Sequence, residues 1–168
     1  MNREVEQVSN GMRTILVVED YDDVRQMLRI LLESENFCVL EASSGAEALQ
    51  VLRSGRPDVI LMDLALPEFD GFETIRRIRK IDGFQNTPII ILSAYSGLSV
   101  YETARRAGID FVMTKPIDFD ELAELIGRIF EGGPVRNLKA IRSSAQRAVV
   151  NGKVTMPRAM IREIRLTT

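Results

Sequence analysis

Five short apolar runs recur along the chain between residues 13 and 130, and segments with a helical pattern separate them. Each run is too short for a buried helix and is rich in Ile, Val and Leu, which is typical of strands buried on both faces. The runs are 14–18, 37–40, 59–62, 89–92 and 111–113. Strands that alternate with helices in this way predict repeated βα units around a parallel sheet.

The segments between the runs carry the signals of amphipathic helices. Apolar residues recur at i, i+3, i+4 and i+7 between Val24 and Leu32, and the last segment, 122–130, repeats this spacing. Helix starts are indicated where a short polar side chain stands three positions before a glutamate, since it can accept from free backbone N–H groups. Such pairs are Ser44 and Glu47, Asp70 and Glu73, Ser99 and Glu102, and Asp118 and Glu121.

Five parallel strands and five helices predict a doubly wound α/β fold with right-handed crossovers. In this class of fold, ligands bind in the crevice at the carboxyl ends of the strands. We expect three parts along the chain: a flexible polar segment, 1–11; the α/β domain, 12–131; and a short basic, helical extension, 132–168.

Composition excludes several kinds of chemistry. The sequence has no histidine and a single cysteine, Cys38, which excludes Cys/His zinc sites, Ser-His-Asp hydrolysis and a disulfide within these residues. The polar start lacks the apolar stretch of a signal peptide, and no run approaches the ~20 apolar residues that span a bilayer. We therefore expect a cytoplasmic protein without membrane insertion.

Polar side chains follow four of the five predicted strands. Glu19 and Asp20 follow the first strand, Asp63 the third, Ser93 the fourth and Lys115 the fifth. Since the carboxyl ends of parallel strands meet at one edge, three carboxylates converge there and would raise at least one pKa unless a cation compensates them. Oxygen ligands without imidazole favour Mg²⁺.

In this order, these residues resemble the receiver domain of two-component response regulators. The resemblance covers roughly residues 13–131 and rests on short motifs at the ends of predicted strands. The motifs are Val17-Val18-Glu19-Asp20, Leu61-Met62-Asp63-Leu64 with Pro67 and Asp70-Gly71, Leu92-Ser93-Ala94, and Gly108 with Thr114-Lys115-Pro116. The resemblance implies a flavodoxin-like fold with strand order 2-1-3-4-5.

The resemblance also implies a phosphoacceptor and a metal site. Asp63 would accept a phosphoryl group from a phosphohistidine of a sensor histidine kinase or phosphotransfer protein. Mg²⁺ would be held by Glu19, Asp20, Asp63 and the backbone carbonyl of Ala65. The metal would neutralise the charge that develops during phosphoryl transfer.

Lys115 and Ser93 complete the implied site. Lys115 would pair with a phosphoryl oxygen, Ser93 would donate its hydroxyl to the phosphoryl group, and a cis peptide bond is expected before Pro116. No general base or separate substrate pocket is indicated, so we expect self-phosphorylation and autodephosphorylation rather than enzymatic turnover. A Mg²⁺-dependent phosphatase acting on outside substrates is the weaker alternative.

Purely structural roles are the alternative for each of these residues. Glu19 and Asp20 could simply begin the next helix, with Asp22 as its N-cap. Lys115 could be a surface lysine and Ser93 a filler hydroxyl. Their joint placement at one sheet edge favours the functional interpretation.

One position departs from the family's pattern. The residue three before Lys115 is usually aromatic and is thought to rotate inward on activation, but here it is Val112. Phe111 is one residue away and, by strand alternation, points to the other face. This departure argues against the usual aromatic switch, and Tyr95, Tyr101 or movement of the loop after the fourth strand would have to replace it.

The extension differs from the domain in charge. Residues 1–131 carry 14 Lys and Arg against 23 Asp and Glu, a net charge of −9, whereas residues 132–168 carry 8 against one, a net charge of +7. After a break at Gly132-Gly133-Pro134, apolar residues follow at helical spacing. They are Val135, Leu138, Ile141, Ala145 and Ala148 or Val149. A basic amphipathic helix is the prediction, with Asn151-Gly152 either its end or a hairpin turn.

The 37 residues of the extension are too few for a conventional DNA-binding output domain. We expect the extension to fold against the acidic domain or against a homodimer partner; DNA binding through its positive charge is the alternative. The sequence thus predicts a response regulator that signals through altered protein–protein contacts.

Overall fold

The computed structural model describes residues 11–67, 71–94, 104 and 106–132 of the 168-residue chain. Most of the expected flexible segment, 1–11, and all but the first residue of the basic extension, 132–168, lie outside the described residues. Asp70, Tyr95, Ser99 and Tyr101 also lie outside them, so the expectations for these positions stay predictions.

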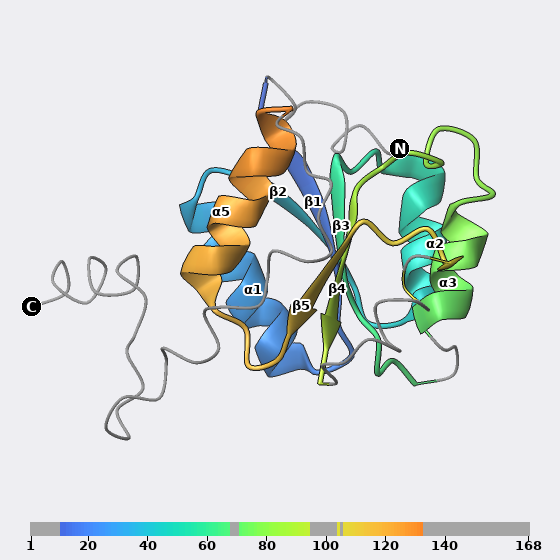
Figure 1. The fold of residues 1–168 in the computed structure, drawn as a ribbon, viewed down its shortest axis with the longest axis horizontal. Coiled ribbons are helices and arrows are strands. Elements are labelled where there is room, and N and C mark those ends of the chain that lie inside the picture. The colour runs from blue at the N-terminus through green and yellow to red at the C-terminus, as the bar shows by residue number, and fades with distance from the viewer. Residues whose placement is uncertain (1–10, 68–70, 95–103, 105, 133–168) are drawn as a thin grey trace, which may run out of the picture.

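A five-stranded, all-parallel sheet forms the centre of the molecule (Figure 1). Its strands are β1 (Thr14–Val18), β2 (Cys38–Ala42), β3 (Val59–Asp63), β4 (Ile89–Ser93) and β5 (Phe111–Thr114). The strand order is β2-β1-β3-β4-β5, and each neighbouring pair is parallel. The predicted α/β fold and strand order are confirmed.

Only β2 departs from its predicted range by more than one residue at an end. The apolar run predicts a strand over 37–40, but the strand continues to Ala42 and includes Glu41. The carboxylate of Glu41 lies 3.4 Å from Arg25 Nε and 3.3 Å from Arg29 Nε. These ion pairs let a charged residue occupy the edge strand, whose ladder to β1 depends on backbone rather than side-chain groups.

Helices cover both faces of the sheet (Figure 1). On one face lie α1 (Asp22–Ser34) and α5 (Phe119–Phe130), and on the other lie α2 (Gly45–Ser54) and α3 (Gly71–Ile78). These are the four helices in the described part of the chain. The fifth predicted helix, between β4 and β5, falls mainly on residues outside it, although Ala104 and Arg106 are helical.

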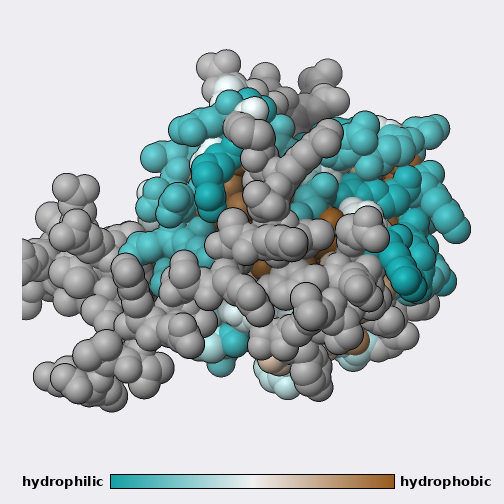
Figure 2. All heavy atoms as spheres, viewed as in Figure 1, coloured by the Kyte–Doolittle hydropathy of each residue, from teal (hydrophilic) through white to brown (hydrophobic). Residues whose placement is uncertain are grey.

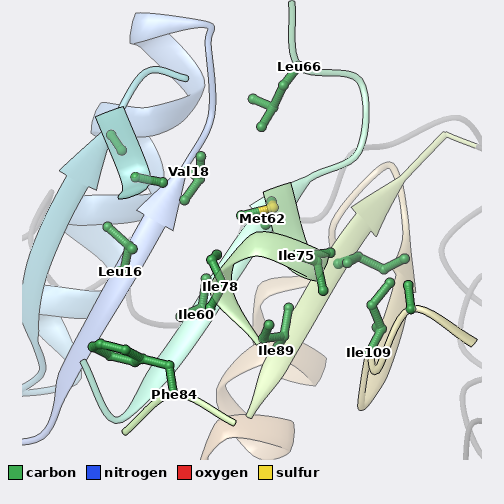
Figure 3. Close-up of a cluster of buried hydrophobic side chains, with 14 of the residues drawn as sticks. Leu16, Val18, Ile60, Met62, Leu66, Ile75, Ile78, Phe84, Ile89 and Ile109 are labelled. Atoms are coloured by element: carbon green, nitrogen blue, oxygen red, sulfur yellow. The ribbon is translucent and has the colours of Figure 1, made fainter. Parts of the chain in front are cut away.

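Two hydrophobic clusters, one on each side of the sheet, form the core. Figure 3 shows the cluster on the α2 and α3 side, where Leu16 and Ile60 of the sheet lie near Ile78 of α3. Strand alternation decides which cluster a residue joins: Val112 packs in this cluster, and Phe111 in the one beneath α1 and α5. The described surface in the view of Figure 2 is mostly hydrophilic, which is consistent with these buried clusters.

Two of the predicted helix caps are confirmed. The Ser44 side chain accepts from Glu47 N at 3.2 Å, and the Asp118 side chain accepts from Glu121 N at 3.1 Å. Asp22 is not an N-cap: Tyr21 takes that position without a side-chain cap, and Asp22 is the first helical residue. The Asp22 carboxylate instead pairs with Arg25 one turn later. Of the described helices, none has the length and apolar character needed to cross a membrane.

Candidate functional site

Three carboxylates converge at the carboxyl edge of the sheet. Glu19 and Asp20 directly follow β1, and Asp63 ends the neighbouring strand β3, where Val18 and Met62 are paired. One oxygen from each of the three acids lies within 4.8 Å of the others. Glu19 is 0% exposed and Asp63 is 2% exposed, so water does little to screen their mutual repulsion.

Lys115 reaches these acids from the other side of β4. Its Nζ lies 2.6 Å from Asp63 Oδ2 and 3.2 Å from Glu19 Oε2, so one ammonium bridges two buried carboxylates. The residue directly follows β5, and its backbone N donates to Ser93 O at 2.8 Å. The peptide bond between Lys115 and Pro116 is cis, as expected.

The pKa values of Glu19 and Lys115 are both raised, which disfavours the charged form of Glu19 and favours the charged form of Lys115. Burial, together with the nearby charge of Asp63, raises the pKa of Glu19 above its usual value of 4.5 despite the attraction of Lys115. Burial alone would lower the pKa of Lys115, but the hydrogen bond and charge of Asp63, with help from Glu19, raise it. Lys115 therefore keeps its positive charge. One ammonium is nevertheless too little positive charge to balance the three acids of the cluster.

The donor set fits a hard divalent cation. Three carboxyl groups face one ammonium, and every candidate ligand is an oxygen atom. Asp20 Oδ1 is buried yet has no hydrogen-bond partner, which is rare because an unsatisfied buried acceptor costs roughly 1–3 kcal/mol. A Mg²⁺ ion would satisfy this oxygen and offset the excess negative charge.

Arg25 holds the loop that carries Glu19 and Asp20. Its Nη1 donates to the backbone carbonyl of Glu19 at 2.8 Å, and its Nε lies 3.4 Å from the Glu41 carboxylate. The loop is held further where Glu19 N donates to Ala42 O at 3.0 Å. Sequence reasoning missed Arg25; the available signal was a basic residue in the first turn of the helix that follows the acids.

Backbone contacts also position Asp63. Ala65 N donates to Asp63 Oδ1 at 3.0 Å, and Leu64 N donates to Leu92 O at 3.1 Å. Gly71, at the start of α3, lies so close that an added Cβ would be 3.1 Å from Asp63 O and 3.0 Å from Leu64 Cα. The strand end that carries Asp63 is therefore tightly confined, and a side chain at position 71 would push against the backbone of Asp63 and Leu64.

Ser93 and Val112 occupy buried places near the site. Ser93 ends β4, which lies between the strand of Asp63 and the strand before Lys115, and it is 1% exposed. Val112 is 1% exposed and fully packed in the core on the α2 and α3 side. Its side chain is therefore part of the core and not of the surface.

The parallel sheet and the buried acid–lysine cluster at its carboxyl edge define an α/β protein whose site can bind a cation and a charged group. Residues 15–127 match the family model of the response regulator receiver domain, and the chain belongs to this family. It is thus the receiver domain of a two-component response regulator.

Known proteins of similar length resemble this domain. The chain is 40% identical over 112 residues to an uncharacterized 14.6 kDa protein of Leptolyngbya boryana, covering 67% of this chain and 86% of the relative. It is 31% identical over 112 residues to sporulation initiation phosphotransferase F of Bacillus subtilis, covering 67% and 89%. The solved structure of chemotaxis response regulator CheY4 of Vibrio cholerae superposes with a TM-score of 0.67 at 28% identity, covering 70% of this chain and 98% of that one.

Proposed function

We propose that Asp63 accepts a phosphoryl group from a phosphohistidine in a Mg²⁺-dependent reaction, and that the phosphorylated domain signals through altered protein–protein contacts. One observation carries the proposal: the buried Asp63 carboxylate lies 2.6 Å from a lysine ammonium, beside two more acids. A buried carboxylate that is held between a fixed cation and a prospective metal site has the surroundings of a phosphoryl acceptor.

The transfer step is a displacement at phosphorus. An Asp63 carboxylate oxygen forms the new O–P bond while the P–N bond to the donor imidazole breaks, and the leaving nitrogen keeps the electron pair and takes up a proton. The 168 residues contain no histidine, so the donor histidine lies outside them. We assign this role to a sensor histidine kinase or phosphotransfer protein.

The other site residues would support this step. Mg²⁺ held by Glu19, Asp20, Asp63 and the Ala65 carbonyl would neutralise charge on the transferred group. Lys115 provides a fixed positive charge for a phosphoryl oxygen, and the Ser93 hydroxyl would donate to the phosphoryl group once formed. The domain modifies only itself, and we expect no turnover of unrelated phosphoesters.

Intact-mass measurement of the full chain with Mg²⁺ and acetyl phosphate tests the proposal. Wild type should gain one adduct of about 80 Da, the mass of one phosphoryl group, and only when Mg²⁺ is present. Asp63→Asn should gain none, and Asp82→Asn, an exposed acid outside the site, should behave like wild type. An equal adduct on Asp63→Asn would disprove the assignment.

Three further expectations stay predictions. DNA binding by the extension has no support from the described residues, because the extension lies almost wholly outside them. The homodimer and the cytoplasmic location likewise depend on features that the described residues do not report.

A further inference from the structure

A shallow groove lies between the second half of α1 and the first half of α5, and the buried side chains of Leu28, Leu32 and Leu122 form its floor. Leu28, Leu31 and Leu32 of α1 and Phe119 of α5 form its apolar lining, and Glu35 and Asp120 stand at its edge. We propose that this α1–α5 groove binds the chain's own basic segment, residues 135–149.

The charge around the groove is acidic. Glu35 and Asp120 line it and are exposed, and no residue that lines it is basic. The two arginines of α1, Arg25 and Arg29, turn instead toward Glu41 of β2. The groove therefore combines apolar contact area with uncompensated negative charge at its edge, which suits a basic amphipathic helix.

The surface of α5 also leaves room for a helix to approach. Ala123 lines the groove, and Gly127 follows it by four residues on the same side of the helix. A Cβ added to Gly127 would meet no other atom within 4 Å, so the space outside it is open. Small residues at this spacing let a second helix backbone come close to α5.

The sequence of the segment matches this surface. Its apolar positions, at helical spacing, would face the groove, while its basic residues would reach the acidic edge. The apolar positions are Val135, Leu138, Ile141, Ala145 and Val149, and the basic residues are Arg136, Lys139, Arg142 and Arg147. The extension as a whole has a net charge of +7, against −9 for the rest of the chain.

Length and direction also allow the segment to reach the groove. α5 ends at Phe130, and Gly132 has a φ of +68°, a left-handed conformation in which the chain can turn back along the helix that it has just left. A 15-residue helix is ~22 Å long, slightly more than the ~18 Å of the 12-residue α5. The segment is therefore long enough to run back along α5 and reach the groove at the N-terminal half of this helix within the same molecule.

Paramagnetic broadening in the full chain tests the proposal. A nitroxide label on Lys139→Cys, in a Cys38→Ser background, places the probe on the polar side of the segment. Amide signals of Leu31, Glu35 and Gly127 should lose most of their intensity, while those of Gln50 in α2 on the opposite face should keep it. Absent or uniform broadening would overturn the proposal.

Matched variants separate the causes. Leu138→Asp with Ile141→Asp should abolish the broadening by removing the apolar contacts, with an otherwise unchanged spectrum showing that the domain stays folded. Glu35→Lys with Asp120→Lys should weaken it, whereas Asp82→Lys, an exposed acid away from the groove, should not. If Asp82→Lys weakened the broadening as much as Glu35→Lys with Asp120→Lys, the proposed attraction between the basic segment and the acidic edge of the groove would be refuted.

A mixed sample identifies which copy the segment binds. Isotope-labelled protein without nitroxide is mixed with nitroxide-labelled protein at natural isotope abundance. No broadening in the mixture is expected for a segment bound within its own molecule. Broadening at α1 and α5 in the mixture would show that the segment binds a second copy, and the proposal would be wrong in that respect.

Discussion

Charged side chains lie at both edges of the sheet, but the two edges differ in how far these charges are hydrogen-bonded and balanced. At the amino edge, Arg79 makes hydrogen bonds of 2.6–2.9 Å to the carbonyls of Phe84, Thr87 and Gly108 and to the carboxylate of Asp110. At the carboxyl edge, three acids lie together and one ammonium pairs with two of them, Glu19 and Asp63. The first cluster is internally complete, whereas the second lacks positive charge.

Burial shifts the pKa values in both clusters. At the amino edge, burial lowers the pKa of Arg79 and raises that of Asp110, and their ion pair opposes both shifts. A backbone N–H, from Ile89, also bonds the Asp110 carboxylate at 2.8 Å. At the carboxyl edge, the buried Asp20 Oδ1 has no partner. Satisfied charges stabilise a fold, and unsatisfied ones retain the capacity to bind a ligand.

The largest expected effect is at the amino edge. Arg79→Ala should lower the free energy of unfolding by about 2 kcal/mol, because it leaves three carbonyls without this donor and leaves the Asp110 carboxylate with only the bond from Ile89 N. Urea denaturation measures this, and Mg²⁺ affinity should not change. The control is Arg76→Ala, whose exposed pair with Glu73 should matter little. A loss no larger than the control's would mean that the cluster is not stabilising.

Arg25→Leu should affect the carboxyl edge. Without the bond to the Glu19 carbonyl, the acidic loop loses its anchor, and Mg²⁺ affinity should fall about tenfold, the range for residues that orient metal ligands. Titration calorimetry measures the affinity. Arg29→Leu is the matched control, because Arg29 also pairs with Glu41 but makes no described contact with Glu19. Equal losses in both variants would contradict a specific role for Arg25.

Asp20→Asn should have opposite effects on stability and on binding. In the absence of Mg²⁺, removal of one of three crowded carboxylates should raise the free energy of unfolding by about 1 kcal/mol. The same change should abolish the rise in Tm that Mg²⁺ produces in wild type. Thermal unfolding with and without Mg²⁺ measures both effects. A lower stability in metal-free buffer would show that the acids do not strain the fold.

Glu47 provides the smallest test, because it is an acid of the carboxyl edge that is satisfied. Hydrogen bonds from the Ser43 hydroxyl and N–H lower the pKa of Glu47 below 4.5, so its ionised form stabilises the fold above that pH. Glu47→Gln should cost about 0.5 kcal/mol at neutral pH. The difference from wild type should disappear as pH falls through the lowered pKa, and urea midpoints across pH measure it. A pH-independent difference would contradict this account.

Local patterns were enough to predict most of the fold. Runs of Ile, Val and Leu located the strands to within one residue at each end except in β2, because strands buried on both faces need continuous apolar sequence. The same runs placed Glu19, Asp63 and Lys115 at strand ends, and hence at one edge. Caps at Ser44 and Asp118 were also predictable, since a cap and its partner lie within four residues.

Contacts between distant segments could not be predicted in this way. Nothing near Arg79 in sequence indicates its contacts with Gly108 and Asp110, 29 and 31 residues away. The apolar run stops before Glu41, so the predicted strand ended at residue 40. The partners of Glu41 lie on α1, and the sequence of the strand does not indicate them.

The sequence by itself thus determined which residues reach the carboxyl edge, because continuous apolar runs and their alternation with helical segments are features of the local sequence. Only the tertiary structure decided that one ammonium bridges Asp63 and Glu19, that Asp20 Oδ1 has no partner and that Arg25 anchors the loop. Those facts depend on how far strands and helices are turned and shifted against each other, and the packing of the whole core determines that geometry.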